Sequence, residues 1–553
     1  MCTIHSSISM PVGVSSFEKI REDDAYYIDK TGLIEELIHL KADVTLFTRP
    51  RRFGKTLTMR MLESFFDISK DSKELFAGLK VSENKELCAM YMNQYPTIFL
   101  TFKEIEGLNF ESAYGSLCMV IADCFKQYTH ILDCSKADEA DKELFRKIKA
   151  QKASVAEVKS ALKLLTRLLS SYYNKPVIFL LDEYDVPLAK ASEKGYYEEM
   201  LDVMRGLMQV LKDSDCLKFA VITGCLCISK ESIFTGMNNF SVNTITASYF
   251  NEYFGFTESE VKKLLKDTGT LSQYPVIKEW YDGYNFGGID IYCPWDVINY
   301  VFEFLMGEKN LPKCYWNNTS TNSIIRSFID SYGDEIQEEF EALLRGSTIQ
   351  MPIKEELTYD VLHSSKDNFW SILYLTGYLT GEKVDETPSG EVSLRIPNKE
   401  IKKIFKDTVL EWFKDSVLTL NRKKLFDALW NKDTQTLTEQ ITKILVRTIS
   451  YYDYREDFYH AFLAGIFTGA GYRVESNREH GEGRSDIVVK DIRNFRIAVF
   501  EIKHSAKKAD LEKDCEKALE QIRDKQYIAD YEEDYDEILC YGVAFCKKRC
   551  RVK

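Results

Sequence analysis

Residues 49–56 carry side chains and a glycine at the spacing that phosphate binding requires. Gly54, Lys55 and Thr56 follow a short apolar run and precede an apolar helix face. A strand, a tight loop and a helix present backbone N–H groups and a positive helix end to an anion. Lys55 would reach the β- and γ-phosphates of a nucleotide, and the Thr56 hydroxyl would take a Mg²⁺ position. We assign cofactor binding to Arg51, Arg52, Phe53, Gly54, Lys55 and Thr56.

Arg49 departs from the Gly-x4-Gly-Lys-Ser/Thr pattern, which has glycine at this position. Taken alone, the loop is as compatible with an ordinary strand-to-helix turn carrying a basic cluster as with a phosphate site. Arg51 or Arg52 would touch nucleotide phosphates or act as a trans-acting finger, and no sequence feature decides between these roles.

Asp182 and Glu183 close a run of five apolar residues, 177–181. This pattern predicts a strand buried on both faces, with carboxylates at the end where open α/β sheets bind ligands. Asp182 would hold Mg²⁺, directly or through water, and Glu183 would orient and deprotonate the attacking water. A strand ending in solvated acids is the alternative, which the upstream Gly-Lys-Thr loop disfavours. Thr223 ends another predicted strand, either as a γ-phosphate sensor or as a plain strand terminator.

A second group of charges lies near the C-terminus, where Asp486 precedes Glu501-Ile502-Lys503 by fourteen intervening residues. Alternation along a strand places Glu501 and Lys503 on one side, and an antiparallel hairpin would bring Asp486 beside them. The two carboxylates and the Ile502 carbonyl would bind a divalent cation, while Lys503 would stabilise developing negative charge. Glu456 is a further candidate metal ligand. The alternative is an edge hairpin with a surface Asp and a Glu-x-Lys ion pair.

The elements that must position these residues follow from hydrophobic periodicity. Strands and helices alternate from about Asp43 to Phe254, which predicts a parallel sheet with helices on both faces. Residues 255–435 read as mainly helical with aromatic side chains at turns. From about Ser450 the pattern is helix, three strands, helix and a last strand.

Composition bounds the class of protein. The chain has 553 residues, 45% of them hydrophobic and 29% charged, and a formal net charge of −13. Such a charge argues against a surface coated with basic residues for unspecific nucleic-acid binding, although a local basic groove remains compatible with it. The 14 cysteines lack Cys-x-x-Cys spacing, and no signal peptide or membrane-spanning run is evident. We therefore expect reduced thiols, a cytoplasmic location and no membrane partner.

The chain resembles a bacterial and archaeal family that joins an AAA-like ATPase domain to a C-terminal PD-(D/E)xK nuclease-superfamily domain. The likeness rests on the segments 27–31, 49–56, 181–187, 223–224, 232–234, 238–239, 254–257, 376–379 and 396–398, and on Asp486 with Glu501-x-Lys503. It implies that Arg49 is part of the family's own loop. It also implies that Gln521 and Tyr527 support the nuclease site or contact nucleic acid. The family's proline-aspartate pair is Ser485-Asp486 here, which leaves the metal-binding aspartate in place.

The resulting fold class is α/β, with three regions. Residues 1–254 would form an AAA-like P-loop ATPase domain, residues 255–435 a mainly helical lid or connector, and residues 436–553 a small restriction-endonuclease-like nuclease domain.

The leading hypothesis is an ATPase with a Mg²⁺-dependent endonuclease domain, in which nucleotide state gates cleavage of DNA or, less favoured, RNA. The cofactors would be ATP and Mg²⁺, with Mn²⁺ an alternative at the nuclease site, and homo-oligomerisation is left open. Residues 456–553 hold 18 Lys and Arg against 20 Asp and Glu, a net charge of −2, which is low for gripping a long duplex. The rivals are a nucleotide-dependent signalling switch whose C-terminal domain only binds nucleic acid or a protein, and an ATPase that keeps a nuclease-derived scaffold for assembly.

Overall fold

The computed structural model describes most of the chain as two compact units. One comprises residues 1–317 and 348–402, and the other residues 318–347 and 403–553. The described residues are 8–212, 215–228, 233–234, 239–307, 311–316, 336–357, 359, 365–383, 391–406, 422–446, 456–468, 472–480, 483–524, 528, 531–532, 534–547 and 549–553.

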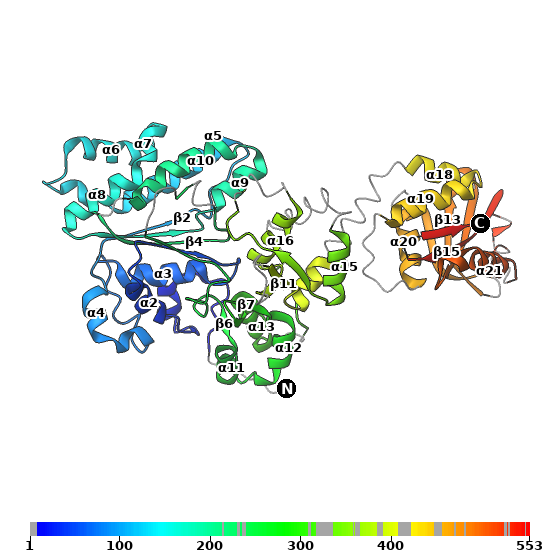
Figure 1. The fold of residues 1–553 in the computed structure, drawn as a ribbon, viewed down its shortest axis with the longest axis horizontal. Helices are drawn as coiled ribbons and strands as arrows, with labels where there is room; N and C mark the ends of the chain where they lie inside the picture. Colours follow the sequence, from blue (N-terminus) through cyan, green and yellow to red (C-terminus); the bar gives the residue numbers. More distant parts are fainter. Residues whose placement is uncertain are drawn as a thin grey trace. The chain divides into compact units, whose positions relative to one another are not determined.

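A five-stranded, fully parallel sheet forms the centre of the first unit, in the order β2-β3-β4-β1-β5. All six residues of β3 are buried, because helices cover both faces of the sheet. In Figure 1, α5, α6, α8 and α10 lie on one face, and α2 and α3 on the other. The predicted parallel sheet is therefore confirmed. Its strands are β1 (Val44–Thr48), β2 (Thr97–Thr101), β3 (Val177–Asp182), β4 (Leu217–Gly224) and β5 (Phe240–Asn243).

Local signals set where the helices around this sheet begin. Asn109 and Ser112 form a capping box at the start of α5, and Ser154 and Glu157 form one at the start of α7. The helices are α1 (Phe17–Glu22), α2 (Gly32–Leu40), α3 (Lys55–Phe66), α4 (Lys85–Tyr91), α5 (Phe110–Gln127), α6 (Glu139–Lys149), α7 (Val155–Lys159), α8 (Ala161–Tyr173), α9 (Val186–Lys194) and α10 (Tyr197–Leu207).

The middle of the chain combines helices with two small antiparallel sheets, for whose strands the sequence patterns gave no expectation. Its described helices are α11 (Glu258–Asp267), α12 (Tyr274–Tyr281), α13 (Pro294–Leu305), α15 (Gln337–Arg345) and α16 (Lys366–Leu375). One sheet has the order β6-β8-β7 and the other β10-β11-β9. The strands are β6 (Phe256–Thr257), β7 (Tyr284–Phe286), β8 (Ile289–Tyr292), β9 (Ile349–Pro352), β10 (Thr380–Lys383) and β11 (Glu391–Arg395).

A mixed five-stranded sheet, in the order β12-β13-β14-β15-β16, forms the core of the second unit. The first three strands are antiparallel, β14 and β15 are parallel, and β16 returns antiparallel along the edge. This confirms the predicted element order and adds β16. The elements are α18 (Arg422–Trp430), α19 (Thr434–Val446), α20 (Glu456–Thr468), β12 (Arg473–His480), β13 (Gly483–Asp491), β14 (Arg496–His504), α21 (Leu511–Asp524), β15 (Glu537–Cys546) and β16 (Arg549–Val552).

The two faces of this sheet bury different helices. Residues of α18, α19 and α20 share one apolar core with Phe500, Ile502 and Phe545. On the opposite face, Leu511 and Cys515 of α21 pack against Ala544. Because side chains alternate along a strand, Glu501 and Lys503 point toward the α21 face.

A lipid bilayer could not be crossed by any helix in the described ranges, since each is too short or too polar.

Candidate nucleotide and nuclease sites

The loop between β1 and α3 closes around the Lys55 side chain. Gly54 caps α3 with a positive φ of 83°, a conformation that glycine adopts without a Cβ clash. Lys55 is 3% exposed, and its Nζ donates to the carbonyl oxygens of Arg49 at 3.0 Å and Pro50 at 3.1 Å. Burial alone would lower the pKa of Lys55, but the neighbouring Cys225, Glu183 and Asp185 outweigh it and raise that pKa. The loop thus holds a fully charged ammonium group at the carboxyl edge of the sheet.

Arg49 has a structural role that explains why this loop has no glycine there. Its side chain is fully buried, and Nη1 donates to the carbonyl oxygens of Thr48 at 2.9 Å and Asn243 at 2.7 Å. The guanidinium carbon lies 5.3 Å from the ring centroid of Phe254 and 5.6 Å from that of Phe286. Arg49 therefore ties the start of the loop to the end of β5 and to the following segments.

Asp182 lies at the centre of a group of hydroxyls at the strand ends. Its Oδ2 accepts from Thr56 Oγ1 at 2.8 Å and Thr101 Oγ1 at 3.3 Å, and its Oδ1 accepts from Thr223 Oγ1 at 2.7 Å. Burial and then the charge of Glu183 raise the pKa of Asp182, while the Thr223 and Thr56 hydroxyls act in the opposite direction. A carboxylate and a hydroxyl in contact form an oxygen donor set that suits Mg²⁺.

Glu183 has a strained backbone and faces Lys55. Its φ is 55°, a left-handed conformation that is rare for residues other than glycine and recurs at functional sites. The Oε1 atom lies 3.4 Å from Lys55 Nζ. The backbone N–H of Glu183 points to Thr223 Oγ1 at 3.5 Å. The structure thus brings together Lys55, Thr56, Asp182, Glu183 and Thr223.

Two other loop residues, Arg52 and Phe53, pack against aromatic side chains of the middle region. Phe53 is buried, with its ring centroid 5.0 Å from that of Tyr284 and 5.1 Å from that of Phe286. The Arg52 guanidinium stacks 4.9 Å from the Trp295 ring centroid and donates to the Tyr315 carbonyl oxygen. Phe53 therefore faces an apolar core, and the Arg52 guanidinium faces Trp295 and Tyr315.

Two further residues connect the loop to the segments that lead into the second unit. Trp316 Nε1 donates to the Arg51 carbonyl oxygen at 3.4 Å, and its backbone N–H donates to Glu400 Oε1 at 2.8 Å. Glu400 and Asp296 are both fully buried. Burial raises the pKa of both carboxyl groups, and the charge of Asp296 raises that of Glu400 further. The pair therefore favours holding a proton.

Sequence reasoning missed three residues of this site. Cys225 Sγ lies 3.5 Å from Lys55 Nζ and 4.0 Å from Glu183 Oε2. Asp185 is buried and accepts from the Cys225 and Leu226 backbone N–H groups at 3.0 Å. The third is Thr101 on Asp182. For Asp185 the available signal was its place in the acidic run Asp182-Glu183-x-Asp185, which was not used. Thr101 had no such signal, because no local sequence pattern reveals that β2 lies beside β3 in the sheet.

The segment 27–31 is one of those on which the family resemblance rests, and it contacts elements that are distant in the sequence. Lys30 Nζ contacts both Glu260 carboxylate oxygens at 2.7 Å and donates to the Glu252 carbonyl at 2.6 Å. Asp29 accepts from the backbone N–H groups of Thr31 and Lys80. These contacts give the segment a structural role at the base of α2 and α11.

The second candidate site lies where β13 and β14 meet. Ile487 pairs with Phe500 in the antiparallel ladder, so the next residues along the two strands, Asp486 and Glu501, lie opposite each other. Asp486 Oδ2 accepts from the Ile502 N–H at 2.7 Å, and Lys503 Nζ lies 2.9 Å from Glu501 Oε1. Glu501 is 2% exposed. The hairpin thus brings Asp486, Glu501 and Lys503 together, and two carboxylates with a carbonyl between them fit a hard divalent cation.

The outer part of this site includes a histidine that the sequence patterns did not single out. His460 Nε2 lies 2.5 Å from the Asp486 carbonyl oxygen. Glu456, the further metal ligand predicted from the sequence, lies one helical turn before His460 on α20, where the structure describes its backbone but not its side chain. Tyr527 lies outside the described residues, and Gln521 is half-buried on α21. Among the described side chains, no three His, Cys, Asp or Glu residues gather as a metal-binding cluster.

Comparisons with known proteins agree with both candidate sites, the one around Lys55 and the one around Asp486. Residues 11–234 match the family model described as predicted AAA-ATPase, and residues 454–553 match that of the PD-(D/E)XK nuclease superfamily. The chain is similar to an uncharacterized protein in the vnfD 5' region of Azotobacter chroococcum mcd 1. The two are 26% identical over 557 residues, which cover 97% of this chain and 96% of the relative. The chain therefore joins an AAA-ATPase-like domain to a domain of the PD-(D/E)XK nuclease superfamily.

Proposed function

We propose that the protein binds and hydrolyses ATP and cleaves phosphodiester bonds in nucleic acid with a divalent metal ion, and that nucleotide state gates the cleavage. One observation carries the proposal: the chain holds two separate polar sites, one around Lys55 and Asp182 at the strand ends of the parallel sheet and one around Asp486 and Glu501 within the β13–β14 hairpin. DNA is preferred over RNA as the substrate class.

At the nucleotide site, Lys55 and the N–H groups at the start of α3 would hold the ATP phosphates. Thr56 and Asp182 would hold Mg²⁺, which draws charge from the phosphates when bound. Glu183 would accept a proton from the attacking water. For this its carboxylate must part from Lys55, which pairs with it at 3.4 Å.

At the nuclease site, Asp486, Glu501 and the Ile502 carbonyl would hold Mg²⁺ or Mn²⁺, which polarises the phosphodiester when bound. Lys503 would place its positive charge beside the scissile phosphate. The Ile502 N–H fixes one oxygen of Asp486, so the carboxylate keeps a single orientation toward the site.

Support for gating comes from contacts within the first unit. The chain passes to the second unit after residues 317 and 402. Just before these points, Trp316 and Glu400 contact each other, and Trp316 also contacts the carbonyl of loop residue Arg51. A change in the loop on nucleotide binding would therefore reach both connecting segments directly.

The test is an incubation of the full-length chain with single- and double-stranded DNA and RNA, with Mg²⁺ or Mn²⁺, with and without ATP. The variants are Lys55→Ala, Asp486→Ala and Lys503→Ala, with exposed Lys85→Ala and Asp524→Ala as matched controls. Cleavage should require Asp486 and Lys503 and should change with ATP only when Lys55 is present. Undiminished cutting by Asp486→Ala would refute the nuclease assignment.

Two other outcomes separate the alternatives. Cutting that ignores both ATP and Lys55→Ala would refute the gating alone. ATP hydrolysis without any cutting would favour a nucleotide-dependent switch whose C-terminal domain binds but does not cleave.

A further inference from the structure

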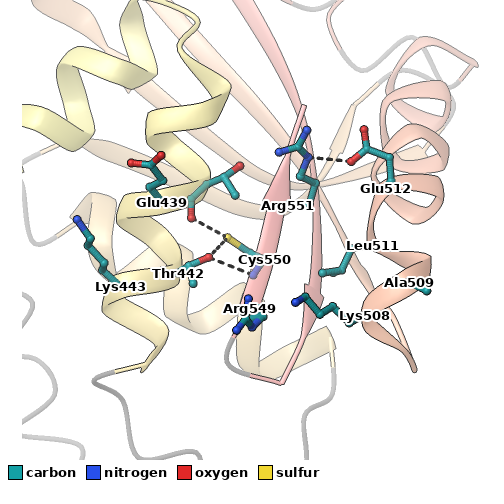
Figure 2. A pocket seen from close by; sticks show the side chains of 11 residues that line it. Glu439, Thr442, Lys443, Lys508, Ala509, Leu511, Glu512, Arg549, Cys550 and Arg551 are labelled. Atoms are coloured by element: carbon teal, nitrogen blue, oxygen red, sulfur yellow. Dashed lines mark hydrogen bonds and ion pairs between the residues drawn. The ribbon is translucent and has the colours of Figure 1, made fainter.

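A cleft of about 600 Å³ lies between α19, the start of α21 and the edge strand β16. Four cations line it, with two carboxylates (Figure 2): Lys443, Lys508, Arg549, Arg551, Glu439 and Glu512. This cleft is separate from the side chains of the two sites described above.

The cleft keeps an excess of positive charge. Arg551 Nε lies 2.8 Å from Glu512 Oε2, and Lys553 Nζ lies 2.7 Å from Glu512 Oε1, so Glu512 is neutralised by neighbours. Lys443, Lys508 and Arg549 are exposed and form no ion pair with any residue in the described part of the chain. Among the described residues that line the cleft, Glu439 is the one carboxylate left to oppose these three charges. Residues 456–553, which supply β16 and α21, have a net charge of −2, so the local charge of the cleft is opposite in sign to that of this segment.

The chemistry of the lining favours phosphate over base recognition. None of the described residues lining the cleft is aromatic, so the cleft offers no stacking surface for a base. Long cationic side chains on an open surface match the spaced charges of a sugar-phosphate backbone.

Sheet register places the cleft next to the nuclease residues. Lys503 pairs with Ala544, and Ala544 pairs with Arg551 on β16. Two strand spacings separate Lys503 from Arg551, about 10 Å in all. Since directly paired residues point to the same face, Glu501, Lys503, Arg549 and Arg551 all project toward the α21 side. A strand held at Lys503 would reach the cleft within a few nucleotides.

We propose that this cleft binds the backbone phosphates of the nucleic-acid strand that flanks the bond to be cleaved, through Lys443, Lys508 and Arg549. The inference rests on the proposed nuclease function. It adds a phosphate-binding surface beside the catalytic carboxylates that would bind nucleic acid regardless of its base sequence. Such a grip lets an acidic domain hold nucleic acid through one local basic surface.

The test uses the full-length chain carrying Asp486→Asn to prevent cleavage, and measures the fluorescence anisotropy of labelled single- and double-stranded DNA and RNA across a salt series. Replacing Lys443, Lys508 and Arg549 together by Ala should weaken binding at least tenfold. It should also flatten the log Kd against log salt slope by about two to three, since each phosphate contact contributes about 0.7 to 0.9. The control replaces Lys424, Lys513 and Lys517, which are exposed cations outside the cleft.

Three results would decide the matter. The inference is overturned if the cleft variant keeps the parent's slope, or if the control loses as much affinity. It is also overturned if tripolyphosphate binding depends on the cleft while nucleic-acid binding does not. The exchanges Lys443→Arg, Lys508→Arg and Arg549→Lys keep the charge and should keep the slope, and circular dichroism checks that each variant folds.

Failure of the inference and failure of the proposed function are distinguishable. If the wild-type chain cuts nothing but binding depends on the cleft, the nuclease proposal fails and the cleft stands as a nucleic-acid site. If the chain cuts and the cleft variant binds like the control, the inference fails alone.

Discussion

The carboxylate of Glu183 lies 3.4 Å from the ammonium group of Lys55, so two groups assigned to ATP chemistry pair with each other. Replacing Glu183 by Gln should free Lys55 for phosphates and remove the base. We expect ATP affinity to be kept or increased, while hydrolysis falls by about 10²–10⁴-fold. Calorimetric ATP binding and phosphate release measure the two effects. Hydrolysis within twofold of wild type would show that Glu183 is not the base.

Strain at Glu183 gives a second prediction, because its φ of 55° suits glycine better than alanine. Both Glu183→Gly and Glu183→Ala remove the carboxylate. The difference between their free energies of unfolding therefore measures the cost of the backbone conformation alone. The Gly variant should be more stable by about 1–2 kcal/mol in denaturant unfolding.

The control for strain is Glu193, an exposed residue within helix α9. There the order should reverse, with Ala more stable than Gly by about 1 kcal/mol. An Ala variant at position 183 that equals or exceeds the Gly variant would contradict the strain.

Arg49 allows a test of sequence consensus against structure. Arg49→Gly restores the glycine of the general phosphate-loop pattern but removes the bonds to the Thr48 and Asn243 carbonyls. Because these carbonyls would lose a buried donor, we expect a loss of about 3 kcal/mol or more in stability and weaker ATP binding. Thermal unfolding and ATP titration check this. Tighter ATP binding by Arg49→Gly would mean that the arginine is dispensable.

The buried pair of Asp296 and Glu400 predicts a pH dependence of stability. Burial raises the pKa of both groups, so the folded state keeps protons that the unfolded state has lost. This contribution is complete below the ordinary carboxyl pKa and is lost as pH rises toward the raised folded pKa. Nearby Cys293, Tyr284 and Arg52 belong to the same environment.

Glu400→Gln measures that contribution as a difference. The free energy of unfolding of wild type minus that of the variant should decrease between about pH 5 and about pH 9. Denaturant unfolding at several pH values gives the difference. An increase with pH over this range would reverse the assigned direction.

Trp316 provides a test of coupling that leaves both catalytic groups in place. Trp316→Phe removes the Nε1 donor to the Arg51 carbonyl and keeps an aromatic ring against Tyr378. We expect ATP hydrolysis to persist while the effect of ATP on nuclease rate declines several-fold. Trp280→Phe, on a half-buried tryptophan of α12, is the matched control. Equal ATP dependence in all three proteins would exclude this route.

Local patterns predicted the elements whose apolar runs are long and continuous. The strand ending at Asp182 and the hairpin that joins Asp486 to Glu501 both form, because strand alternation and chain reversal are set within about twenty residues. The role of Arg49 was not predictable, since its acceptors Asn243 and Phe250 lie about two hundred residues away. The short strands of the middle region escaped detection because two to five residues carry too little periodicity.

The covering of β16 by α19 has a consequence for producing the nuclease domain alone. The outward N–H groups of Cys550 and Val552 are satisfied by the hydroxyls of Thr442 at 3.4 Å and Thr438 at 3.0 Å. A fragment that begins near residue 454, where the family match starts, lacks those threonines and the apolar faces of α18 and α19. Its bare strand edge would recruit other copies and aggregate. A fragment beginning before Arg422 should remain monodisperse.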